Sequence, residues 1–223
     1  MERSLWQSGA LRVVGVDECG MGSLCSAVVA AACLVRTNCK RIDGVRDSKT
    51  LSAGQRVRLA GEIRRRSVLV SLGAASVAEI DRINIYHATH LAMRRALRRV
   101  VPYDHVLVDG RRIAGFDDVG PHTAVVDGDA LSYAIACASV VAKVTRDRLL
   151  ARLAVRHPGY GWEHNAGYST REHLSALRTL GVTPHHRRSF APARSGGAEQ
   201  VELDLEGVAV GLPEMVGGGR LPD

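Results

Sequence analysis

The chain has 223 residues, of which 46% are hydrophobic, and a formal net charge of +7 at pH 7. This length accommodates one well-filled domain with at most a small appendage, and the apolar content is ordinary for a globular protein. No apolar run reaches the length of a membrane span, and the first residues lack the layout of a secretory signal. We therefore expect a cytoplasmic protein that does not contact a membrane.

The charge is unevenly distributed along the chain. Residues 195–223 carry six acidic side chains and one basic side chain, a net of −5, which leaves +12 on residues 1–194. A basic body favours a polyanionic partner, and the low aromatic content of 4% argues against single-strand binding by stacked aromatic platforms. We predict a folded domain over 1–194 and a flexible acidic tail over 195–223. The split also raises the hypothesis that the tail folds back over a basic groove.

The first predicted element is a β-hairpin over residues 13–35. An apolar strand at 13–16 is followed by a glycine-rich break and a second apolar strand at 27–35. Asp17 and Glu18 stand at the end of the first strand, where we expect the backbone to turn. A lone Asp-Glu pair would be read as a solvated turn. Here Gly20-Met21-Gly22 follows, and its glycines allow a ligand close to the backbone, which favours metal-assisted chemistry on a phosphate.

Helical and strand patterns alternate after the hairpin. Ser52 and Gln55 have the spacing of a capping box and predict a helix that begins at Ala53. The elements expected downstream are a helix over 53–66, a strand over 68–75, a short helix or turn over 77–84 leading into a helix over 85–99, a strand over 105–108, a loop-like stretch over 111–124, a last short strand at 125–126, and helices over 132–156 and 171–180, the second capped by Thr170.

The five cysteines form no C-x-x-C pair, so their spacing fits neither a zinc site nor a disulfide framework. We expect them to be reduced, small and mostly buried.

Acidic side chains stand at three strand ends or turns: Asp17-Glu18, Asp109 and Asp129. Hard divalent cations prefer oxygen ligands, and two neighbouring cations need several carboxylates around them. Acids at the edge of one sheet can converge on such a site. Spacing alone leaves open whether these four do.

The chain resembles the ribonuclease HII family, whose members cut at ribonucleotides in DNA and in RNA–DNA hybrids. The matching segments, in the family's order, are VVGVDECGMGSL, DSKTLS, EIDRINIYHATHLAMRRAL, VLVDG, VVDGDALSYAIACASVVAKVTRDRLL, YGWEHNAGYSTREHL and HHRRSFAP. They span about residues 13–192. The resemblance implies an α/β fold, a ribonuclease H-like mixed sheet flanked by helices, with a helical C-terminal portion that completes the substrate groove.

The resemblance also implies a two-metal site for Mg²⁺ or Mn²⁺ held by Asp17, Glu18, Asp109 and Asp129. Asp17 would bridge both cations, Asp109 and Asp129 would complete the two sites, and Glu18 would bind the cation that stabilises the leaving group. The products would carry a 5′-phosphate and a 3′-hydroxyl. Another acid, Asp147, is expected to pair with Lys143 or Arg146 on its own helix.

Substrate choice requires contact with a 2′-hydroxyl, which distinguishes RNA from DNA at one nucleotide. The resemblance assigns this contact to the backbone of Gly20, Met21 and Gly22, with Tyr168 stacking on the sugar beyond. The candidate contacts to backbone phosphates are Ser48, Lys49, Ser139, Lys143, Arg187 and Arg188. The expected partner is an RNA–DNA hybrid or ribonucleotide-containing duplex DNA, bound by a monomer.

The sequence departs from the family in one loop. Met21 replaces the usual arginine, Ser23 replaces a proline, and Cys25-Ser26-Ala27 replaces a run that normally includes Gly and Pro. Methionine supplies neither charge nor donor, and losing a charged contact to phosphate costs about 1.5–3 kcal/mol if nothing replaces it. Without proline the loop is also expected to be less rigid. We therefore expect metal-dependent cleavage to persist, with weakened or altered junction recognition.

Two other readings compete with this one. A divergent paralogue would bind RNA–DNA hybrids or structured RNA with weak or no cleavage; the altered loop motivates it, and the four retained acids argue against it. The other is a resolvase or transposase-like nuclease on the same core, against which the DSK, EIDRIN and HHRRSF segments argue.

Overall fold

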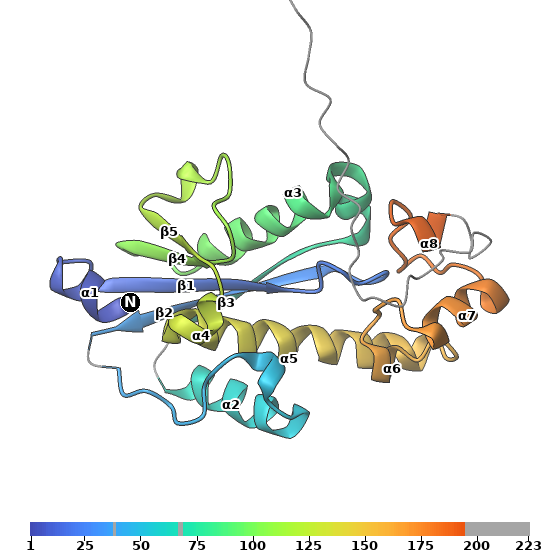
Figure 1. Cartoon of the computed structure of the whole chain (residues 1–223), viewed down its shortest axis with the longest axis horizontal. Helices are drawn as coiled ribbons and strands as arrows, with labels where there is room; N and C mark the ends of the chain where they lie inside the picture. The colour runs from blue at the N-terminus through green and yellow to red at the C-terminus, as the bar shows by residue number, and fades with distance from the viewer. Residues whose placement is uncertain (38, 67–68, 195–223) are drawn as a thin grey trace, which may run out of the picture.

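The computed structural model describes residues 1–37, 39–66 and 69–194, and the predicted acidic tail lies outside this range. A five-stranded mixed sheet forms the centre, in the order β3-β2-β1-β4-β5 (Figure 1). β1 pairs antiparallel with β2 and parallel with β4, β2 pairs antiparallel with β3, and β4 pairs parallel with β5. The strands are β1 (Arg12–Cys19), β2 (Val28–Arg36), β3 (Leu69–Ala75), β4 (His105–Asp109) and β5 (His122–Val125).

Helices cover both faces of the sheet, which confirms the predicted α/β class (Figure 1). α3 packs on one face, α5 with α2 on the other, and α6 to α8 gather at one end. None of the described helices is long and apolar enough to cross a membrane. The helices are α1 (Glu2–Gln7), α2 (Ala53–Arg65), α3 (Val77–Leu97), α4 (Gly128–Leu131), α5 (Tyr133–Arg156), α6 (Trp162–Asn165), α7 (Arg171–Leu180) and α8 (Ala191–Arg194), with single 3-10 turns η1 (Ser48–Thr50) and η2 (Asp117–Val119).

The core has two layers because the sheet is covered on both faces. Val14 and Val16 of β1 pack toward α3, whereas Ala31 and Cys33 of β2 pack toward α5 and α2. A strand buried on both sides needs apolar residues at every position, so β2 shows a continuous apolar run instead of alternation. Three of the cysteines are buried and none of the five forms a disulfide, as expected.

Several local predictions are confirmed. Ser52 and Gln55 form the capping box of α2, and Thr170 caps α7. The boundary expected within 77–99 is a kink in α3 at Asn84, whose φ of 61° leaves the helical region. The Asn84 side chain accepts a hydrogen bond from the His87 backbone N–H at 3.1 Å and so caps the second half of α3.

Two boundaries were predicted wrongly. β5 covers 122–125, inside the stretch expected to be loop-like, and the strand expected at 125–126 is only the end of it. β5 is a short edge strand that contains His122 and Thr123, so it lacks the apolar run that marks a buried strand. β1 continues to Cys19, so Asp17 and Glu18 lie inside the strand, opposite Ala31 and Ala30 of β2, and not in a turn.

Gly15 allows α5 to cross β1 at close range. A Cβ atom on Gly15 would lie 2.1 Å from the backbone carbon of Ala134, at the start of α5. The bare glycine therefore sets the distance between α5 and the strand that carries Asp17 and Glu18.

We predict that Gly15→Ala lowers the free energy of unfolding by about 3 kcal/mol, because backbone atoms of α5 must move. Gly54→Ala is the matched control, since a Cβ at Gly54 in α2 meets nothing within 4 Å. It should stabilise the protein by about 0.5 kcal/mol through helix propensity. Urea unfolding of both variants tests the prediction, and equal effects would contradict it.

Candidate active site

The parallel pairing of β1 and β4 brings the first acids together. Val16 pairs with Val108, so the next residues, Asp17 and Asp109, stand side by side at the ends of neighbouring strands. Glu18 follows on β1, and its backbone N–H donates to Asp17 Oδ1 at 2.7 Å. Sheet register therefore brings Asp17 and Glu18 close to Asp109, which is far from them in the sequence.

Asp129 joins them from α4. The backbone N–H of Gly128 donates to Asp109 Oδ1 at 2.8 Å, which ties the start of α4 to the end of β4. Gly128 has no room for a side chain, because a Cβ would lie 2.9 Å from Asp109 Oδ1. Lys49 faces the group from η1, with Nζ 3.9 Å from Asp129 Oδ2 and the side chain 82% exposed. Asp17, Glu18, Asp109 and Asp129 are called the acid cluster below.

The carboxylates of the acid cluster repel one another. Burial raises the pKa of Asp17 well above its usual value, and the charges of Glu18 and Asp109 raise it further, while a hydrogen bond with Ser139 opposes the rise. Burial and the charge of Asp109 likewise raise the pKa of Glu18. Burial also raises the pKa of Asp109, against the hydrogen bond from Gly128. The fold thus holds these groups where their negative charge is disfavoured.

Asp129 also has Asp47, the first residue of the DSK segment, as a neighbour. Burial raises the pKa of Asp129, and so does a hydrogen bond with Asp47; the charge of Lys49 lowers it. Asp47 is also the N-cap of η1, where it accepts a hydrogen bond from the Lys49 N–H at 2.8 Å. The DSK turn therefore places Lys49 and Asp47 at the rim of the acid cluster.

The acid cluster has the donor chemistry for hard divalent cations. In the described part of the chain, no three His, Cys, Asp or Glu side chains are arranged as ready ligands of a single ion. The donors are nevertheless all carboxylates, they act on one another's pKa, and a divalent cation would relieve their repulsion. The residues fit Mg²⁺ or Mn²⁺ by chemistry, and their joint ligation of two cations stays a prediction.

Two buried arginines hold the loop that follows the acid pair, residues 20–22, called the glycine loop below. The side chain of Arg187 is fully buried; its Nε donates to the Ser26 carbonyl at 3.0 Å and its Nη1 to the Met21 carbonyl at 2.8 Å. Arg146, also fully buried, packs against Gly20, where a Cβ would lie 2.1 Å from its Nε. Arg146 also donates to the carbonyl of Ala166 at 3.0 Å. Both guanidinium groups therefore order loops instead of facing solvent.

Tyr168 stands against the glycine loop, as the resemblance implies. A Cβ on Gly22 would lie 3.7 Å from the Tyr168 ring, and the Arg146 guanidinium lies 5.9 Å from the ring centroid. Both Tyr168, 40% exposed, and Met21, 36% exposed, reach solvent. The structure thus brings together the positions predicted to read a ribose, and this role stays a prediction.

A buried chain of rings fixes the backbone of Tyr168. His173 Nδ1 donates to the Tyr168 carbonyl at 2.9 Å, while its Nε2 accepts from Trp162 Nε1 at 3.0 Å. His186 Nδ1 accepts from the Thr183 N–H at 2.8 Å, so its Nε2 carries the proton and donates to His173 Nε2 at 3.1 Å. Both histidines therefore have to be neutral for this arrangement to hold.

The departures from the family pattern are built into this scaffold. The Ser23 hydroxyl, fully buried, donates to the Gly167 carbonyl at 2.9 Å, next to Tyr168. Ser26 has φ of 70°, a left-handed conformation that favours glycine and explains why glycine is common in this run. The prediction of a less rigid loop is therefore offset in the folded state, because the Ser23 hydroxyl ties the loop to its neighbour.

Three of the six residues predicted to contact phosphate are buried, and their contact with phosphate stays a prediction. The hydroxyls of Ser48 and Ser139 lie 2.8 Å apart in a buried pair, and Arg187 donates to the Met21 and Ser26 carbonyls. Each is a polar residue inside a motif, yet tertiary packing turns it inward. Lys49 and Arg188 are exposed, and their role stays a prediction.

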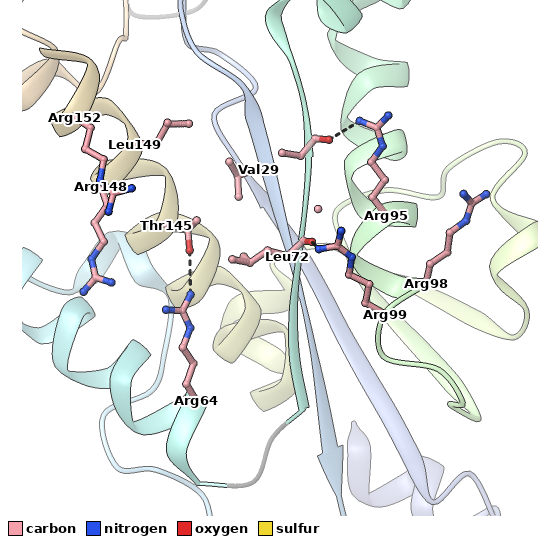
Figure 2. A pocket seen from close by; sticks show the side chains of 12 residues that line it. Val29, Arg64, Leu72, Arg95, Arg98, Arg99, Thr145, Arg148, Leu149 and Arg152 are labelled. Atoms are coloured by element: carbon pink, nitrogen blue, oxygen red, sulfur yellow. Dashed lines mark hydrogen bonds between the residues drawn. The ribbon is translucent and has the colours of Figure 1, made fainter. Parts of the chain in front are cut away.

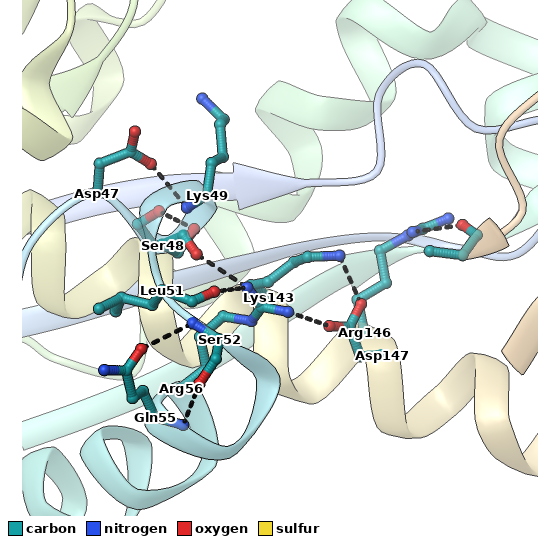
Figure 3. A network of polar contacts seen from close by, with 12 residues as sticks. Asp47, Ser48, Lys49, Leu51, Ser52, Gln55, Arg56, Lys143, Arg146 and Asp147 are labelled. Atoms are coloured by element: carbon teal, nitrogen blue, oxygen red, sulfur yellow. Dashed lines mark hydrogen bonds and ion pairs between the residues drawn. The ribbon is translucent and has the colours of Figure 1, made fainter. Parts of the chain in front are cut away.

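Lys143 is engaged within its own helix. Its Nζ lies 2.7 Å from Asp147 Oδ1, and Arg56 Nη2 lies 3.9 Å from Asp147 Oδ2 (Figure 3). The expected pairing of Asp147 with Lys143 is confirmed, and Arg146 takes no part in it. Contact of Lys143 with phosphate is untested.

Sequence reasoning missed the residues that support the site. The sequence predicted Arg146 only as a possible partner of Asp147, although its i±4 neighbours Ala142 and Leu150 are buried. An arginine on an apolar stripe is a signal for a buried, hydrogen-bonded guanidinium. Arg187 was predicted only as a phosphate contact, and the structure buries it together with His186. Gly128 and His173 gave no local signal, since their roles depend on distant partners.

Comparisons with known proteins agree with this geometry. The family model described as Ribonuclease HII matches residues 14–193. The chain is 54% identical over 191 residues to Ribonuclease HII of Thermosynechococcus vestitus, covering 85% of this chain and 88% of that protein.

Solved structures share the fold. The ribonuclease H2 from Pyrococcus horikoshii OT3 superposes with a TM-score of 0.72 at 25% identity, over 84% of this chain and 97% of that one. Bst-RNase HIII in complex with Mn²⁺ has a TM-score of 0.66 at 15% identity, over 86% of this chain and 71% of that one, a likeness of fold alone.

We predict that the buried histidines make stability fall in mild acid. Burial first, and the neighbouring His173 second, lower the pKa of His186 to about 4. A histidine whose folded pKa lies below its unfolded value stabilises the fold fully above about pH 6.5, and this contribution is lost as pH falls toward about 4. The free energy of unfolding should drop by on the order of 1 kcal/mol between pH 7 and pH 5 from this site.

Urea unfolding followed by tryptophan fluorescence measures this drop. His186→Asn keeps an acceptor for Thr183 without titrating, so its pH dependence should be flatter. His164→Asn, at a side chain that is 78% exposed, is the control and should leave the slope as it is. An unchanged slope in His186→Asn would rule out the buried histidine as its source.

Proposed function

The chain belongs to the ribonuclease HII family, and we propose that it hydrolyses the RNA strand of RNA–DNA hybrids and cuts at ribonucleotides embedded in duplex DNA. The family match supports an endoribonuclease of the ribonuclease H type. The observation that carries the proposal is the acid cluster, in which β1, β4 and α4 bring four carboxylates from distant parts of the chain to one sheet edge. Hydrolysis would leave a 5′-phosphate and a 3′-hydroxyl.

The acid cluster would hold the divalent cations. Bound cations would lower the pKa of the attacking water and neutralise charge on the departing 3′ oxygen. The chain's own part is to hold Asp17 and Asp109 on neighbouring strands through sheet register and to shield Asp17 from water by burial. Lys49, exposed and 3.9 Å from Asp129, is placed to meet a substrate phosphate beside the acids.

The glycine loop and Tyr168 would select the ribonucleotide. Arg187 donates to the Met21 carbonyl and Arg146 donates to the Ala166 carbonyl. The glycine loop and the loop that carries Tyr168 are therefore both held in place without substrate. A prearranged site loses less conformational entropy on binding. The bare Gly22 would let a sugar approach the backbone beside the Tyr168 ring, whereas the space at Gly20 is filled by Arg146.

The alternative of a hybrid-binding paralogue with weak or no cleavage is not favoured, because the family match extends over residues 14–193 and all four acids are present. Among cations, Mg²⁺ and Mn²⁺ are the first to test, since a protein of similar fold is described in complex with Mn²⁺. We further propose that the protein acts as a cytoplasmic monomer.

We predict cleavage of duplex DNA carrying one ribonucleotide, and of longer hybrids, in the presence of Mg²⁺ or Mn²⁺. Asp17→Asn should lower the rate at least about a hundredfold, because it removes a carboxylate from the centre of the cluster. Asp43→Asn, at an exposed acid outside the cluster, is the control and should cleave normally.

Thermal melting provides a readout that does not depend on cleavage. Mn²⁺ should raise the melting temperature of the unaltered chain, because a cation that binds only the folded state stabilises it. The Asp17→Asn variant should lose most of this rise. If the unaltered chain cuts neither substrate and melts at the same temperature with and without Mn²⁺, the proposed function is wrong.

We predict that Met21→Arg raises kcat/KM on a single embedded ribonucleotide by about fivefold. The side chain is partly exposed, so an arginine can reach a phosphate. We expect only a small rise in kcat/KM because the Arg187 guanidinium, which donates to the Met21 carbonyl at 2.8 Å, already places positive charge next to the loop. Met21→Leu is the apolar control; equal rates for both variants would refute the loop's proposed role.

A further inference from the structure

A groove of about 890 Å³ runs along the exposed edge of β3 and is lined by arginines from three helices (Figure 2). Arg95 lies in the last turn of α3, and Arg98 and Arg99 follow the end of that helix. α5 contributes Arg148 and Arg152, and α2 contributes Arg64. Val29, Leu72 and Leu149 form its apolar floor. This feature is called the arginine groove below.

The arginine groove is separate from the acid cluster. β3 is the edge strand of the sheet and is divided from β1 by β2, whereas Asp109 and Asp129 lie on the other side of β1, on β4 and α4. None of the residues assigned to catalysis or ribose recognition lines the groove. Its arginines are therefore not explained by the site described above.

The groove carries a large uncompensated positive charge. Among the described residues that line it, none is acidic. Arg95 pairs with Glu79 at 2.6 Å, and Arg64 donates to Thr145 at 3.3 Å. Arg148 and Arg152 are exposed, and neither has a hydrogen-bond or ion-pair partner in the described part of the chain.

Protection of the edge strand explains only part of this arrangement. Arg95 donates to the Ala74 carbonyl at 2.7 Å and Arg99 to the Leu72 carbonyl at 3.5 Å, so these two cover backbone acceptors that another strand would otherwise pair with. Arg148 and Arg152 come from α5 and cover no backbone of β3. Protection of the β3 edge therefore does not explain Arg148 and Arg152, and their positive charge indicates an anionic occupant of the groove.

We propose that the acidic segment 199–206 of this chain binds the arginine groove and competes there with nucleic acid. The segment contains Glu199, Glu202, Asp204 and Glu206 and no basic residue. The segment lies outside the described residues. Binding is therefore inferred from the acidic sequence of the segment, the charge of the arginine groove, and the position of residues 188–194, which join the segment to the domain. The segment also lies beyond residue 193, where the match to the family model ends.

The residues that precede the segment are tied to α3, the helix whose last turn carries Arg95 of the groove. The backbone N–H groups of Arg188 and Ser189 donate to the Asp81 carboxylate at 3.1 and 2.9 Å, which ties the approach to α8 to the first half of α3. α3 begins two residues after the end of β3. An extended chain spans about 3.4 Å per residue, so Glu199 lies within about 17 Å and Glu206 within about 40 Å of Arg194.

Tethering favours this occupant over an external polyanion. A segment joined by a few residues has an effective concentration of about a millimolar, so weak charge pairs suffice for occupancy. Exposed guanidinium–carboxylate pairs are screened by salt, so occupancy should be high at low ionic strength and low above about 0.5 M. Phosphates of nucleic acid are the competing occupant, and the experiment separates the two.

The direct test is cleavage of the full chain by a glutamate-specific protease. In the Arg148→Gln/Arg152→Gln variant, the rate of cutting within 199–206 should rise about fivefold at low salt, because two of the groove's charges are gone. The difference should vanish at high salt. The control Arg3→Gln/Arg82→Gln removes the same charge from exposed sites outside the groove and should cut at the original rate. Equal rates for the groove variant and the unaltered chain would overturn the proposal.

Affinity for duplex DNA without ribonucleotides gives the second readout. DNA binding should tighten about fivefold at low salt when the segment is neutralised by Glu199→Gln, Glu202→Gln, Asp204→Asn and Glu206→Gln. This gain in affinity should disappear when Arg148→Gln and Arg152→Gln are introduced into the same chain. If the groove variant weakens DNA binding equally with either form of the segment, nucleic acid alone occupies the groove and the proposal is wrong. Cleavage of a hybrid with Mn²⁺ in each variant reports separately on the proposed function.

Discussion

The constraint on which the site depends is the parallel pairing of β1 with β4. It brings Asp17, which is buried, next to Asp109, which is half-buried, so two like charges are held together where water can solvate them only in part. Backbone hydrogen bonds of the sheet and the close contact of α5 at Gly15 keep the pair from separating. The raised carboxylate pKa values are the consequence of this placement. A divalent cation held by these carboxylates would offset their repulsion, so the fold that disfavours the charges without a cation would favour them with one.

Hydrogen bonds from two buried guanidinium groups to loop carbonyls support the loops beside the acids. Burying a guanidinium is unfavourable unless its hydrogen bonds are made, and a loop carbonyl turned away from water is unfavourable for the same reason. Arg187 donates to the carbonyls of Met21 and Ser26, although its Nη2 has no partner among the described residues. Arg146 donates to the Ala166 carbonyl on the Tyr168 side, although its Nε likewise has no partner there. Burial lowers the pKa of Arg187 to about 10, which leaves it charged at neutral pH. Both sides of the ribose contact therefore rest on a positive interior.

Sequence patterns predicted local structure well where the cause is local. The capping box at Ser52 and the break near Asn84 depend on residues within one turn. The acid cluster depends on register between distant strands, and acid spacing alone left it open; the family's segments identified its members. The phosphate contacts show the limit most clearly. Ser48 and Ser139 sit in motifs, yet each hydroxyl faces the other, because the orientation of a side chain is decided by the packing of η1 on α5. Only Arg146 carried an overlooked signal, its place on an apolar stripe.

The altered loop is best understood through what the rest of the chain supplies. Proline at position 23 would restrict the unfolded chain, whereas Ser23 restrains the folded loop by donating to Gly167. Ser26 holds a left-handed conformation that disfavours a side chain by about 1 kcal/mol, and its carbonyl is fixed by Arg187. The same arginine supplies a positive charge at the Met21 carbonyl, in the loop where the family pattern implies an arginine at position 21. A buried charge attracts phosphate but cannot donate to it. The loop therefore keeps its shape and part of its field, and what it lacks is a single directional contact, which affects discrimination between substrates more than the chemistry at the acid cluster.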